Sequence, residues 1–222
     1  MIHRGAPLFE FDKRVAGTLK TNLSNSKIVG IDESGRGPWA GPVLACAVYL
    51  PVGFFHPEIA DSKLIPPKKR TDIYKTLIEN APWAIGIVDV DLIDSLNIAR
   101  ATHLAMKKAL EKLILQYPQV KPDLILIDGL PLPKLGSFNQ KSIVKGDRIS
   151  ASIAAASIIA KVERDKIMDH YDKNYPLYGF KKHKGYGTKL HANKLKELGP
   201  SPLHRKSFSP VLTALKKHHA HQ

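Results

Sequence analysis

The stretch GIDESGRGPWAGPV, residues 30–43, places two acids and a loop rich in glycine and proline between two apolar runs. The runs KIVGID (27–32) and GPVLACAVYL (41–50) are short and rich in β-branched residues, which predicts two strands joined by that loop. Strands connected so briefly should pair antiparallel. Asp32 and Glu33 then stand where a buried strand ends, and burying carboxylates has a desolvation cost that some partner must offset.

The rest of the chain alternates helical and strand patterns. Two prolines open a predicted helix over 66–80, and apolar residues at i, i+3, i+4 spacing predict a longer helix over 95–116, capped by Ser95 or Asn97. Three further strands and a long helix rich in alanine and isoleucine are expected over 83–90, 122–129, 141–147 and 150–171. This order predicts an α/β fold with a mixed five-stranded sheet, helices on its faces, and a basic, mostly helical C-terminal extension.

The length of 222 residues allows one full domain with a small appendage. Residues 1–26 show no sustained periodicity, so we expect a loosely attached lead-in with little function. The α/β domain should then cover 27–172, and the basic extension should cover 173–222.

The charge of the chain points to a polyanionic partner. The formal net charge is +14, and residues 134–206 hold 16 lysines and arginines against 6 acids. A basic surface on one part of a protein favours nucleic-acid binding over merely solvated lysines. The single cysteine, Cys46, lies in an apolar run, and no signal peptide or membrane-spanning run is present, so we expect a cytoplasmic protein with no membrane partner.

Acids follow three of the predicted strands. Asp32 and Glu33 follow IVGI, Asp128 follows LILI, and Asp147 follows SIVKG, and neighbouring strand ends can gather such side chains in one crevice. Clustered carboxylates repel one another, and without a Cys/His set of zinc spacing the neutralising cations should be Mg²⁺ or Mn²⁺. Two such ions in a basic protein suggest phosphodiester hydrolysis. Asp128 with Gly129 could also form an ordinary turn, and Asp147 could cap a helix, so only the set is specific.

The glycines after the paired acids have a different use. Gly35, Gly37 and Gly41 are spaced one residue too long for a dinucleotide-binding loop, and a strand rather than a helix follows them. Glycines on both sides of Arg36 would instead let the backbone approach a ligand closely, with the guanidinium near a phosphate.

Several segments together resemble the ordered motifs of bacterial ribonuclease HII, the type 2 ribonuclease H. They are GIDESGRGPWAGPV, DSK (61–63), LILIDG, SIVKGD, AAASIIAKVERD, HKGYGT and HRKSF, and the resemblance runs from about residue 27 to 210. Ser34 stands where the family often has valine, and DSKLI lacks the second lysine of the common DSKKL. These departures leave details of phosphate contact open.

The resemblance implies a ribonuclease H-like fold and a metal-dependent endonuclease with a two-metal site for Mg²⁺ or Mn²⁺. Such an enzyme hydrolyses the RNA strand of RNA–DNA hybrids and nicks duplex DNA 5′ of an embedded ribonucleotide, leaving a 3′-hydroxyl and a 5′-phosphate. It would serve ribonucleotide excision repair and primer removal. By motif position, the catalytic and metal-ligating roles fall on Asp32, Glu33, Asp128 and Asp147.

The resemblance also implies substrate contacts. The loop of Gly35, Arg36 and Gly37 is similar to the element that reads the 2′-hydroxyl at the scissile phosphate, and Tyr186 is similar to the tyrosine that packs on the deoxyribose after the ribonucleotide. Phosphate-positioning residues, any of which could singly be a solvated surface side chain, are expected at Lys63, His183, Lys184, Arg205 and Lys206.

Three alternatives remain. Ribonuclease HIII shares the chemistry but carries an extra N-terminal domain, and the 26 residues before the first strand are too few for one. A non-catalytic nucleic-acid-binding module would gain nothing from acids that repel phosphate. A resolvase-like or transposase-like nuclease would cut DNA without any ribonucleotide. We expect a monomer, because the sequence has no long heptad pattern.

Overall fold

A mixed five-stranded sheet forms the centre of the molecule, as the sequence predicts. The computed structural model describes residues 5–19, 26–129, 133 and 138–219. The strand order is β3-β2-β1-β4-β5; β2 pairs antiparallel with β1 and β3, and β4 pairs parallel with β1 and β5. The strands are β1 (Ile28–Ser34), β2 (Val43–Tyr49), β3 (Trp83–Val88), β4 (Leu124–Asp128) and β5 (Gln140–Ile143). The predicted antiparallel pairing of the first two strands is confirmed.

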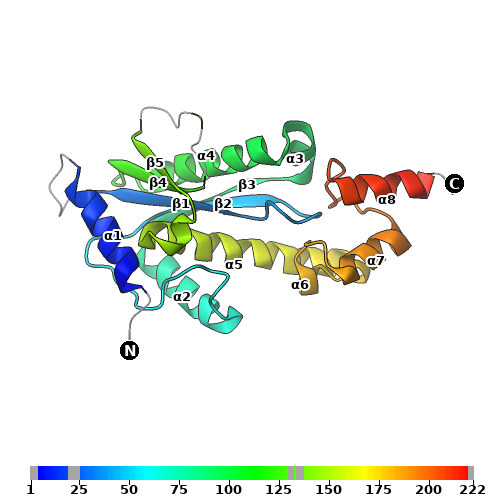
Figure 1. Cartoon of the computed structure of the whole chain (residues 1–222), viewed down its shortest axis with the longest axis horizontal. Helices are drawn as coiled ribbons and strands as arrows, with labels where there is room; N and C mark the ends of the chain where they lie inside the picture. Colours follow the sequence, from blue (N-terminus) through cyan, green and yellow to red (C-terminus); the bar gives the residue numbers. More distant parts are fainter. Residues whose placement is uncertain (1–4, 20–25, 130–132, 134–137, 220–222) are drawn as a thin grey trace.

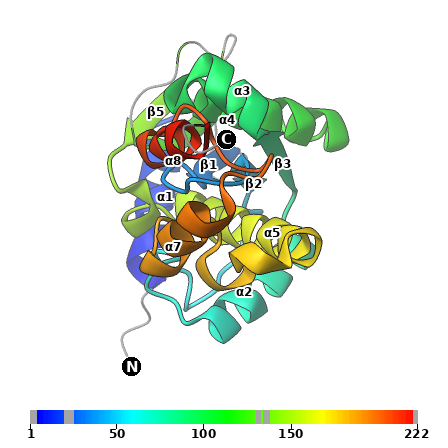
Figure 2. The ribbon, with the colours of Figure 1, turned by 90° about the vertical axis from the view of Figure 1, so that its right-hand side faces the viewer.

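Helices cover both faces of the sheet (Figure 1). In the described part of the chain they are α1 (Ala6–Gly17), α2 (Pro67–Asn80), α3 (Val90–Leu96), α4 (Ile98–Gln116), α5 (Ala151–Asn174), α6 (Phe180–His183), α7 (Lys189–Leu198) and α8 (Ser209–His219), with short 3₁₀ turns η1 (Gly146–Arg148) and η2 (Pro176–Tyr178). α4 lies over one face, and α5 with α2 lies over the other. The end-on view in Figure 2 shows the sheet between these two layers.

The two cores follow from the period of two in a strand. On β2, Leu44 and Cys46 pack toward α5, whereas Val43 and Ala45 pack toward α4. All four are fully buried, so β2 is apolar on both faces, as expected for a strand between two helical layers. Cys46, which lies in an apolar run of the sequence, is therefore a buried core residue with a free thiol.

The N-terminal expectation is wrong in part. Residues 6–17 form α1 rather than a loose lead-in, and Leu8, Phe9 and Val15 are buried against the sheet and α5. The backbone N–H of Ser152, in the first turn of the neighbouring α5, has no acceptor within its own helix. It donates a hydrogen bond to the Asp12 carboxylate of α1 at 2.8 Å. A side chain from a distant helix therefore caps α5, which periodicity within residues 1–26 could not indicate. Residues 1–4 and 20–25 lie outside the described part.

Two further boundaries differ from the sequence prediction. β1 continues through Ser34, two residues beyond the predicted end at Asp32, so Glu33 is a strand residue as well. The predicted helix over 95–116 is split, because α3 ends at Leu96 and Asn97 has a left-handed φ of 68°. Asn97 still caps α4, as its side-chain oxygen accepts hydrogen bonds from Ala99 N and Arg100 N.

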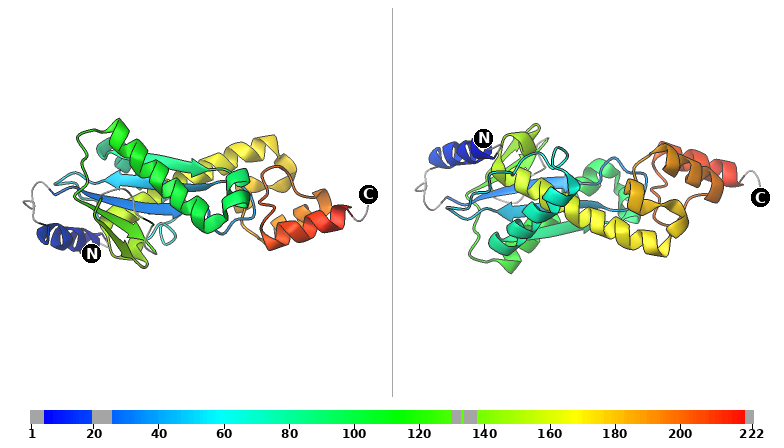
Figure 3. Two further views of the ribbon diagram at one scale, coloured as in Figure 1. Left: turned by 90° about the horizontal axis from the view of Figure 1, so that it is seen from above. Right: turned by 90° about the horizontal axis from the view of Figure 1, so that it is seen from below.

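The C-terminal extension is helical and lies beyond one end of the sheet (Figures 1 and 3). α7 stops at Gly199, which has a φ of 73°, as the glycine and proline after it predict. α8 is the last helix of this extension, and residues 220–222 lie outside the described part. Among the described helices, none is long and apolar enough to cross a membrane.

The position of α5 depends on Gly30 in β1. A methyl group at this position would collide with the backbone of Ser152 in α5. Asp32 is two residues further along the same strand, so it points to the same face, and α5 presents Ser157 and Lys161 beside it. The close approach of helix and strand thus brings basic and hydroxyl groups next to the acid.

Gly30→Ala should lower the free energy of unfolding by about 1–3 kcal/mol, the usual cost of overpacking a core. The backbone of α5, unlike a flexible side chain, cannot move aside locally. Urea denaturation followed by circular dichroism measures the change. Gly37→Ala is the control, because an added methyl there has only Tyr186 Cε1 nearby, at 3.9 Å. Equal stability of the Gly30→Ala variant and the wild type would contradict the assigned close contact.

Candidate active site

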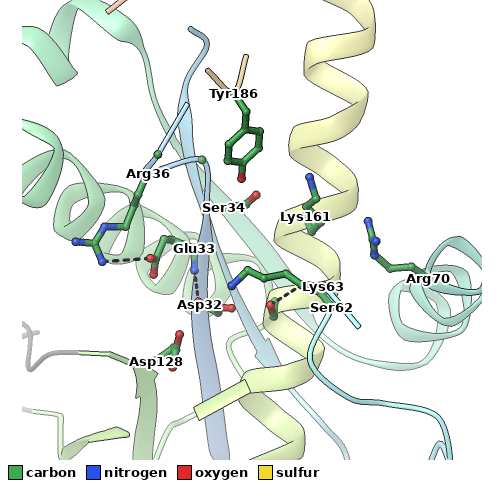
Figure 4. Close-up of a pocket in the computed structure, with 13 residues that line it drawn as sticks. Asp32, Glu33, Ser34, Arg36, Ser62, Lys63, Arg70, Asp128, Lys161 and Tyr186 are labelled. Atoms are coloured by element: carbon green, nitrogen blue, oxygen red, sulfur yellow. Dashed lines mark hydrogen bonds and ion pairs between the residues drawn. The ribbon is translucent and has the colours of Figure 1, made fainter. Parts of the chain in front are cut away.

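One open cleft of about 580 Å³ gathers most of the predicted site. Its lining comes from the end of β1, the loop of Gly35, Arg36 and Gly37, the DSK segment 61–63, α2, β4, α5 and Tyr186. In Figure 4 the acids lie on one side and the basic side chains of Lys63, Lys161 and Arg70 on the other. Segments distant in the sequence therefore meet at the strand ends, as the alternation of strands and helices predicts.

Three carboxylates line this cleft: Asp32, Glu33 and Asp128. Asp32 is only 5% exposed, and its Oδ1 accepts a hydrogen bond from Glu33 N at 2.7 Å. Burial raises the pKa of Asp32 well above its usual value, and the charges of Glu33 and Asp128 raise it further. Among the described residues, no lysine or arginine forms an ion pair with Asp32 or Asp128. Negative charge in the cleft is thus incompletely compensated.

Glu33 differs from Asp32 in having a basic neighbour. Burial raises the pKa of Glu33, the Arg36 guanidinium opposes this, and Asp128 adds to the rise. Arg36 Nη1 lies 3.4 Å from Glu33 Oε1, a long contact, and the Arg36 side chain is 54% exposed. An exposed, weakly held guanidinium can leave this acid when a phosphate or a cation approaches.

Asp128 and Asp147 are linked through η1. Asp128 Oδ1 accepts a hydrogen bond from Gly146 N at 2.6 Å, which fixes the turn that carries Asp147. Asp147 is buried and does not line the cleft; burial raises its pKa, and the charges of Asp61 and Asp128 add to this. Asp147 therefore lies outside the cleft lining, with its carboxylate close enough to Asp128 to interact electrostatically.

Asp61 is an acid whose position the sequence did not indicate. It is 2% exposed, forms an ion pair with Arg148 Nη2 at 3.0 Å and accepts a hydrogen bond from Lys63 N at 2.9 Å. The second contact is a turn in which the aspartate orients the DSK segment. Lys63 is thereby presented at the cleft.

The donor chemistry of this cleft suits a divalent cation. In the described part of the chain, no three metal-ligating side chains already converge as a complete ligand set. The carboxylates of Asp32, Glu33 and Asp128 nevertheless line the same cleft, and carboxylate oxygens are the ligands that Mg²⁺ and Mn²⁺ prefer. The charges of Glu33 and Asp128 also raise the pKa of Asp32. Small movements of these side chains would let cations neutralise them, so the residues fit such ions.

Arg205 holds the glycine loop rather than a phosphate, contrary to expectation. Its side chain is fully buried and donates hydrogen bonds to the carbonyl oxygens of Gly35, Arg36 and Gly41 at 2.6–3.0 Å. Desolvation by burial lowers the pKa of Arg205 to about 9. Gly35 has a φ of 98°, a backbone conformation that glycine adopts without strain. A buried arginine thus fixes the loop from below.

His183 is also not a surface phosphate contact. It is 6% exposed, and its Nε2 lies 2.9 Å from Tyr178 O. Of the remaining expected contacts, Lys63 and Tyr186 line the cleft, whereas Lys184 pairs with Asp169 of α5 and Lys206 is exposed away from the cleft lining.

The sequence reasoning missed several cleft residues. Ser62 and Ser157 join through their hydroxyls at 3.0 Å beside Asp32, and Arg70 and Lys161 line the basic side. Ser157 and Lys161 are four residues apart on α5, so helical spacing from the acid-facing side could have identified them. Arg70 had no such signal, since it enters the cleft from α2.

Comparisons with known proteins agree with this geometry. The family model for ribonuclease HII matches residues 29–211. Ribonuclease HII of Carboxydothermus hydrogenoformans is 49% identical over 185 residues, which is 83% of this chain and 78% of that protein. Ribonuclease HII of Endomicrobium trichonymphae is 48% identical over 205 residues, 92% of this chain and 93% of that protein.

Solved structures share the fold. The ribonuclease H2 from Pyrococcus horikoshii OT3 superposes with a TM-score of 0.64 at 22% identity, covering 87% of this chain and 99% of that one. Bst-RNase HIII in complex with Mn²⁺ superposes with a TM-score of 0.69 at 19% identity, covering 91% of this chain and 72% of that one.

Asp32→Asn should stabilise the protein at neutral pH in the presence of a chelator. A carboxyl whose pKa is raised on folding binds more protons folded than unfolded, so it destabilises the protein increasingly as pH rises above its ordinary value near 4. Urea denaturation in EDTA from pH 4 to 8 should show the advantage of the variant growing with pH. Asp72→Asn on the exposed face of α2 is the control and should change little. An advantage that shrinks with rising pH would contradict the assigned environment.

Proposed function

The chain belongs to the ribonuclease HII family, and we propose that its acidic cleft nicks duplex DNA on the 5′ side of an embedded ribonucleotide as well as cutting the RNA strand of hybrids. Membership makes the protein a ribonuclease H, an endonuclease and hydrolase that acts on RNA–DNA substrates. The curated relatives that are 48–51% identical are named ribonuclease HII, which favours that description over ribonuclease HIII and over a purely binding module. The cut should leave a 3′-hydroxyl and a 5′-phosphate.

The observation that carries the proposal is the pairing of acids and bases across one cleft. Asp32, Glu33 and Asp128 lie on one side, and Lys63 and Lys161 lie on the other. A phosphodiester drawn in by the basic side would approach the carboxylates only if cations stood between them. The same residues would not form a useful site for an uncharged substrate.

We propose that Asp32, Glu33, Asp128 and Asp147 hold Mg²⁺ or Mn²⁺ at a two-metal site. When bound, the ions would supply charge neutralisation for the phosphate and a lowered pKa for the attacking water. Bst-RNase HIII, which shares the fold, was solved in complex with Mn²⁺, and this supports a divalent ion as the cofactor of this chain. Asp147, whose carboxylate interacts electrostatically with Asp128, would complete this set of ligands.

The loop of Gly35, Arg36 and Gly37 is suited to reading a 2′-hydroxyl. Gly37 is exposed, and only the Tyr186 ring lies near its α-carbon on the side where a methyl would stand. Backbone groups of the loop can therefore come within hydrogen-bond distance of a sugar edge, where the 2′-hydroxyl distinguishes a ribonucleotide from a deoxyribonucleotide. Arg205 holds three carbonyl oxygens of this region, which keeps the loop in place before substrate arrives.

The basic side of the cleft would position the phosphates. Lys63, Arg70 and Lys161 line it directly, and Lys161 also pairs with Asp165 at 2.7 Å, which orients its ammonium. Lys184 and Lys206, outside the cleft lining, would contact the duplex further along its backbone. We assign the catalytic domain to 27–172 and the duplex-binding extension to 173–222, acting as a monomer.

Cleavage of an end-labelled DNA duplex with one ribonucleotide tests the proposal, beside an all-DNA duplex, with Mg²⁺, Mn²⁺ or EDTA. The wild type should make one metal-dependent cut 5′ of the ribonucleotide. Asp128→Asn should lose at least about 100-fold in rate, since even second-layer partners of a metal cost up to that much, while duplex binding persists. Asp72→Asn is the control. Cutting of the all-DNA duplex, or wild-type turnover by Asp128→Asn, would contradict the proposal.

Tyr186→Ala should reduce cleavage at a single ribonucleotide by roughly 10-fold more than cleavage of a long hybrid, because aromatic stacking contributes about 1–3 kcal/mol. Tyr186→Phe keeps the ring and should keep this preference. The ratio of kcat/KM values on the two substrates measures the effect. Equal losses on both substrates would show that Tyr186 does not sense the junction.

A further inference from the structure

Three buried histidines lie beneath the loop that carries Tyr186. His183 ends α6, His191 lies in the first turn of α7, and His204 follows α7 in the chain. The rings of His183 and His191 stack at 4.2 Å, and those of His191 and His204 lie 5.1 Å apart. His191 and His204 are fully buried. Phosphate binding cannot explain such side chains, so another role is needed.

Hydrogen bonds determine the tautomer of two of these rings. Ser201 N lies 2.9 Å from His204 Nδ1, and because a backbone N–H can only donate, this Nδ1 accepts. The proton of neutral His204 is therefore on Nε2, which donates to His191 Nε2 at 2.9 Å. His191 then carries its own proton on Nδ1, which donates to Tyr186 O at 3.0 Å. The result is a one-directional relay from Ser201 to the backbone of Tyr186.

The neutral state of the relay has a physical cause. Desolvation by burial lowers the pKa of His191 to about 4 and that of His204 to about 3. Protonated His204 could not accept from Ser201 N, so the relay requires the neutral ring. Both imidazoles are thus in the required state at neutral pH.

His183 supports the preceding residue of the same loop. Gly185 N donates to His183 Nδ1 at 3.2 Å, so His183 carries its proton on Nε2 and donates to Tyr178 O. Gly185 O accepts from Trp39 N at 2.8 Å, which attaches the loop to the segment after the glycine loop. The backbone on both sides of the Gly185–Tyr186 peptide is therefore held by buried groups.

The Tyr186 ring itself has no comparable restraint. It is 40% exposed, and its neighbours are Lys161 Nζ at 5.7 Å and the Arg164 guanidinium at 5.8 Å from the ring centre. Within the described residues, no hydrogen bond to its hydroxyl fixes the ring. The place of the ring in the cleft therefore depends on its backbone. The Tyr186 carbonyl accepts hydrogen bonds from Thr188 N at 2.8 Å and from His191 Nδ1 at 3.0 Å, and the second of these links it to the buried histidines.

We propose that His191 and His204 are positioning residues for Tyr186, a relay that holds its backbone carbonyl and so sets the ring at the junction between ribonucleotide and deoxyribonucleotide. The proposal rests on the function assigned to Tyr186 above. It predicts that substrate preference, and not only stability, depends on a histidine that never touches the substrate.

Long-range ¹H–¹⁵N NMR spectra of the wild-type imidazoles at pH 7 test the relay directly. His204 should be the Nε2–H tautomer and His191 the Nδ1–H tautomer, whereas exposed His170 serves as the reference for a solvated ring. A His191 protonated on Nε2, or a charged His204, would overturn the proposal. This measurement needs no substrate, so its failure would leave the assigned nuclease function standing.

Substitutions test the positioning. His191→Leu removes the donor and should shift the preference for a single ribonucleotide over a long hybrid by about the same factor as Tyr186→Ala, with less than about twofold further change when the two are combined. His191→Asn, whose amide can stand where Nδ1 stood, should retain more of the preference than His191→Leu. His170→Leu is the control and should behave as the wild type.

Independent, multiplicative effects of His191→Leu and Tyr186→Ala would overturn the proposal, as would equal losses on both substrates or equal behaviour of the Asn and Leu variants. If Tyr186→Ala alone leaves the preference unchanged, the role assigned to Tyr186 is wrong and the positioning role falls with it, whatever the tautomers are. If His191→Leu does not fold, the wild-type NMR tautomers still decide.

Discussion

The approach of α5 to β1 at Gly30 is the constraint on which the cleft depends. Without a side chain at this position, the first turn of α5 reaches the strand that bears Asp32. Ser157, Lys161 and Arg164 then follow on successive turns of the same helix. Ser157 bonds to Ser62 of the DSK segment beside Asp32, Lys161 lines the cleft, and Arg164 donates to Pro42 O after the glycine loop. One close packing contact therefore places the parts of the site that come from distant segments.

Buried basic and acidic side chains around α5 and β1 differ in whether protein groups compensate their charge. Arg164 and Arg205 are fully buried, but together they donate seven hydrogen bonds to six carbonyl oxygens, five around the glycine loop and one at Lys184. Buried guanidinium groups that are fully hydrogen-bonded in this way rigidify the loops they join. Asp32 and Asp128 have no ion-pair partner among the described residues, so their charge is left for ligands from outside. The fully hydrogen-bonded arginines thus hold the structure in place, whereas the acids without an ion-pair partner are available for the chemistry.

The sequence predicted what depends on neighbours in the chain. The antiparallel pairing of β1 and β2, the cap at Asn97 and the end of α7 at Gly199 all follow from local patterns. The gathering of Asp32, Glu33 and Asp128 follows from strand order, which alternation of elements also indicates.

What the sequence could not predict depends on partners far along the chain. Arg205 is buried because carbonyl oxygens of Gly35 and Gly41 accept from it across more than 160 residues, and nothing next to HRKSF in the sequence shows this. His183 is buried for a similar reason, and α1 is held by a contact between Asp12 and Ser152. Motif position alone assigned both basic residues to phosphate, whereas in the structure they support the loops behind the substrate.

The central question is whether Asp32 and Asp128, which have no ion-pair partner among the described residues, hold a divalent cation. Mn²⁺ binding measured by electron paramagnetic resonance answers it without any substrate. The wild type and Asp72→Asn should bind Mn²⁺ at neutral pH, and Asp128→Asn should bind at least about 10-fold more weakly, the lower end of the cost of disturbing a metal site. Equal Mn²⁺ binding by the wild type and Asp128→Asn would contradict the assignment of the cleft as a metal centre.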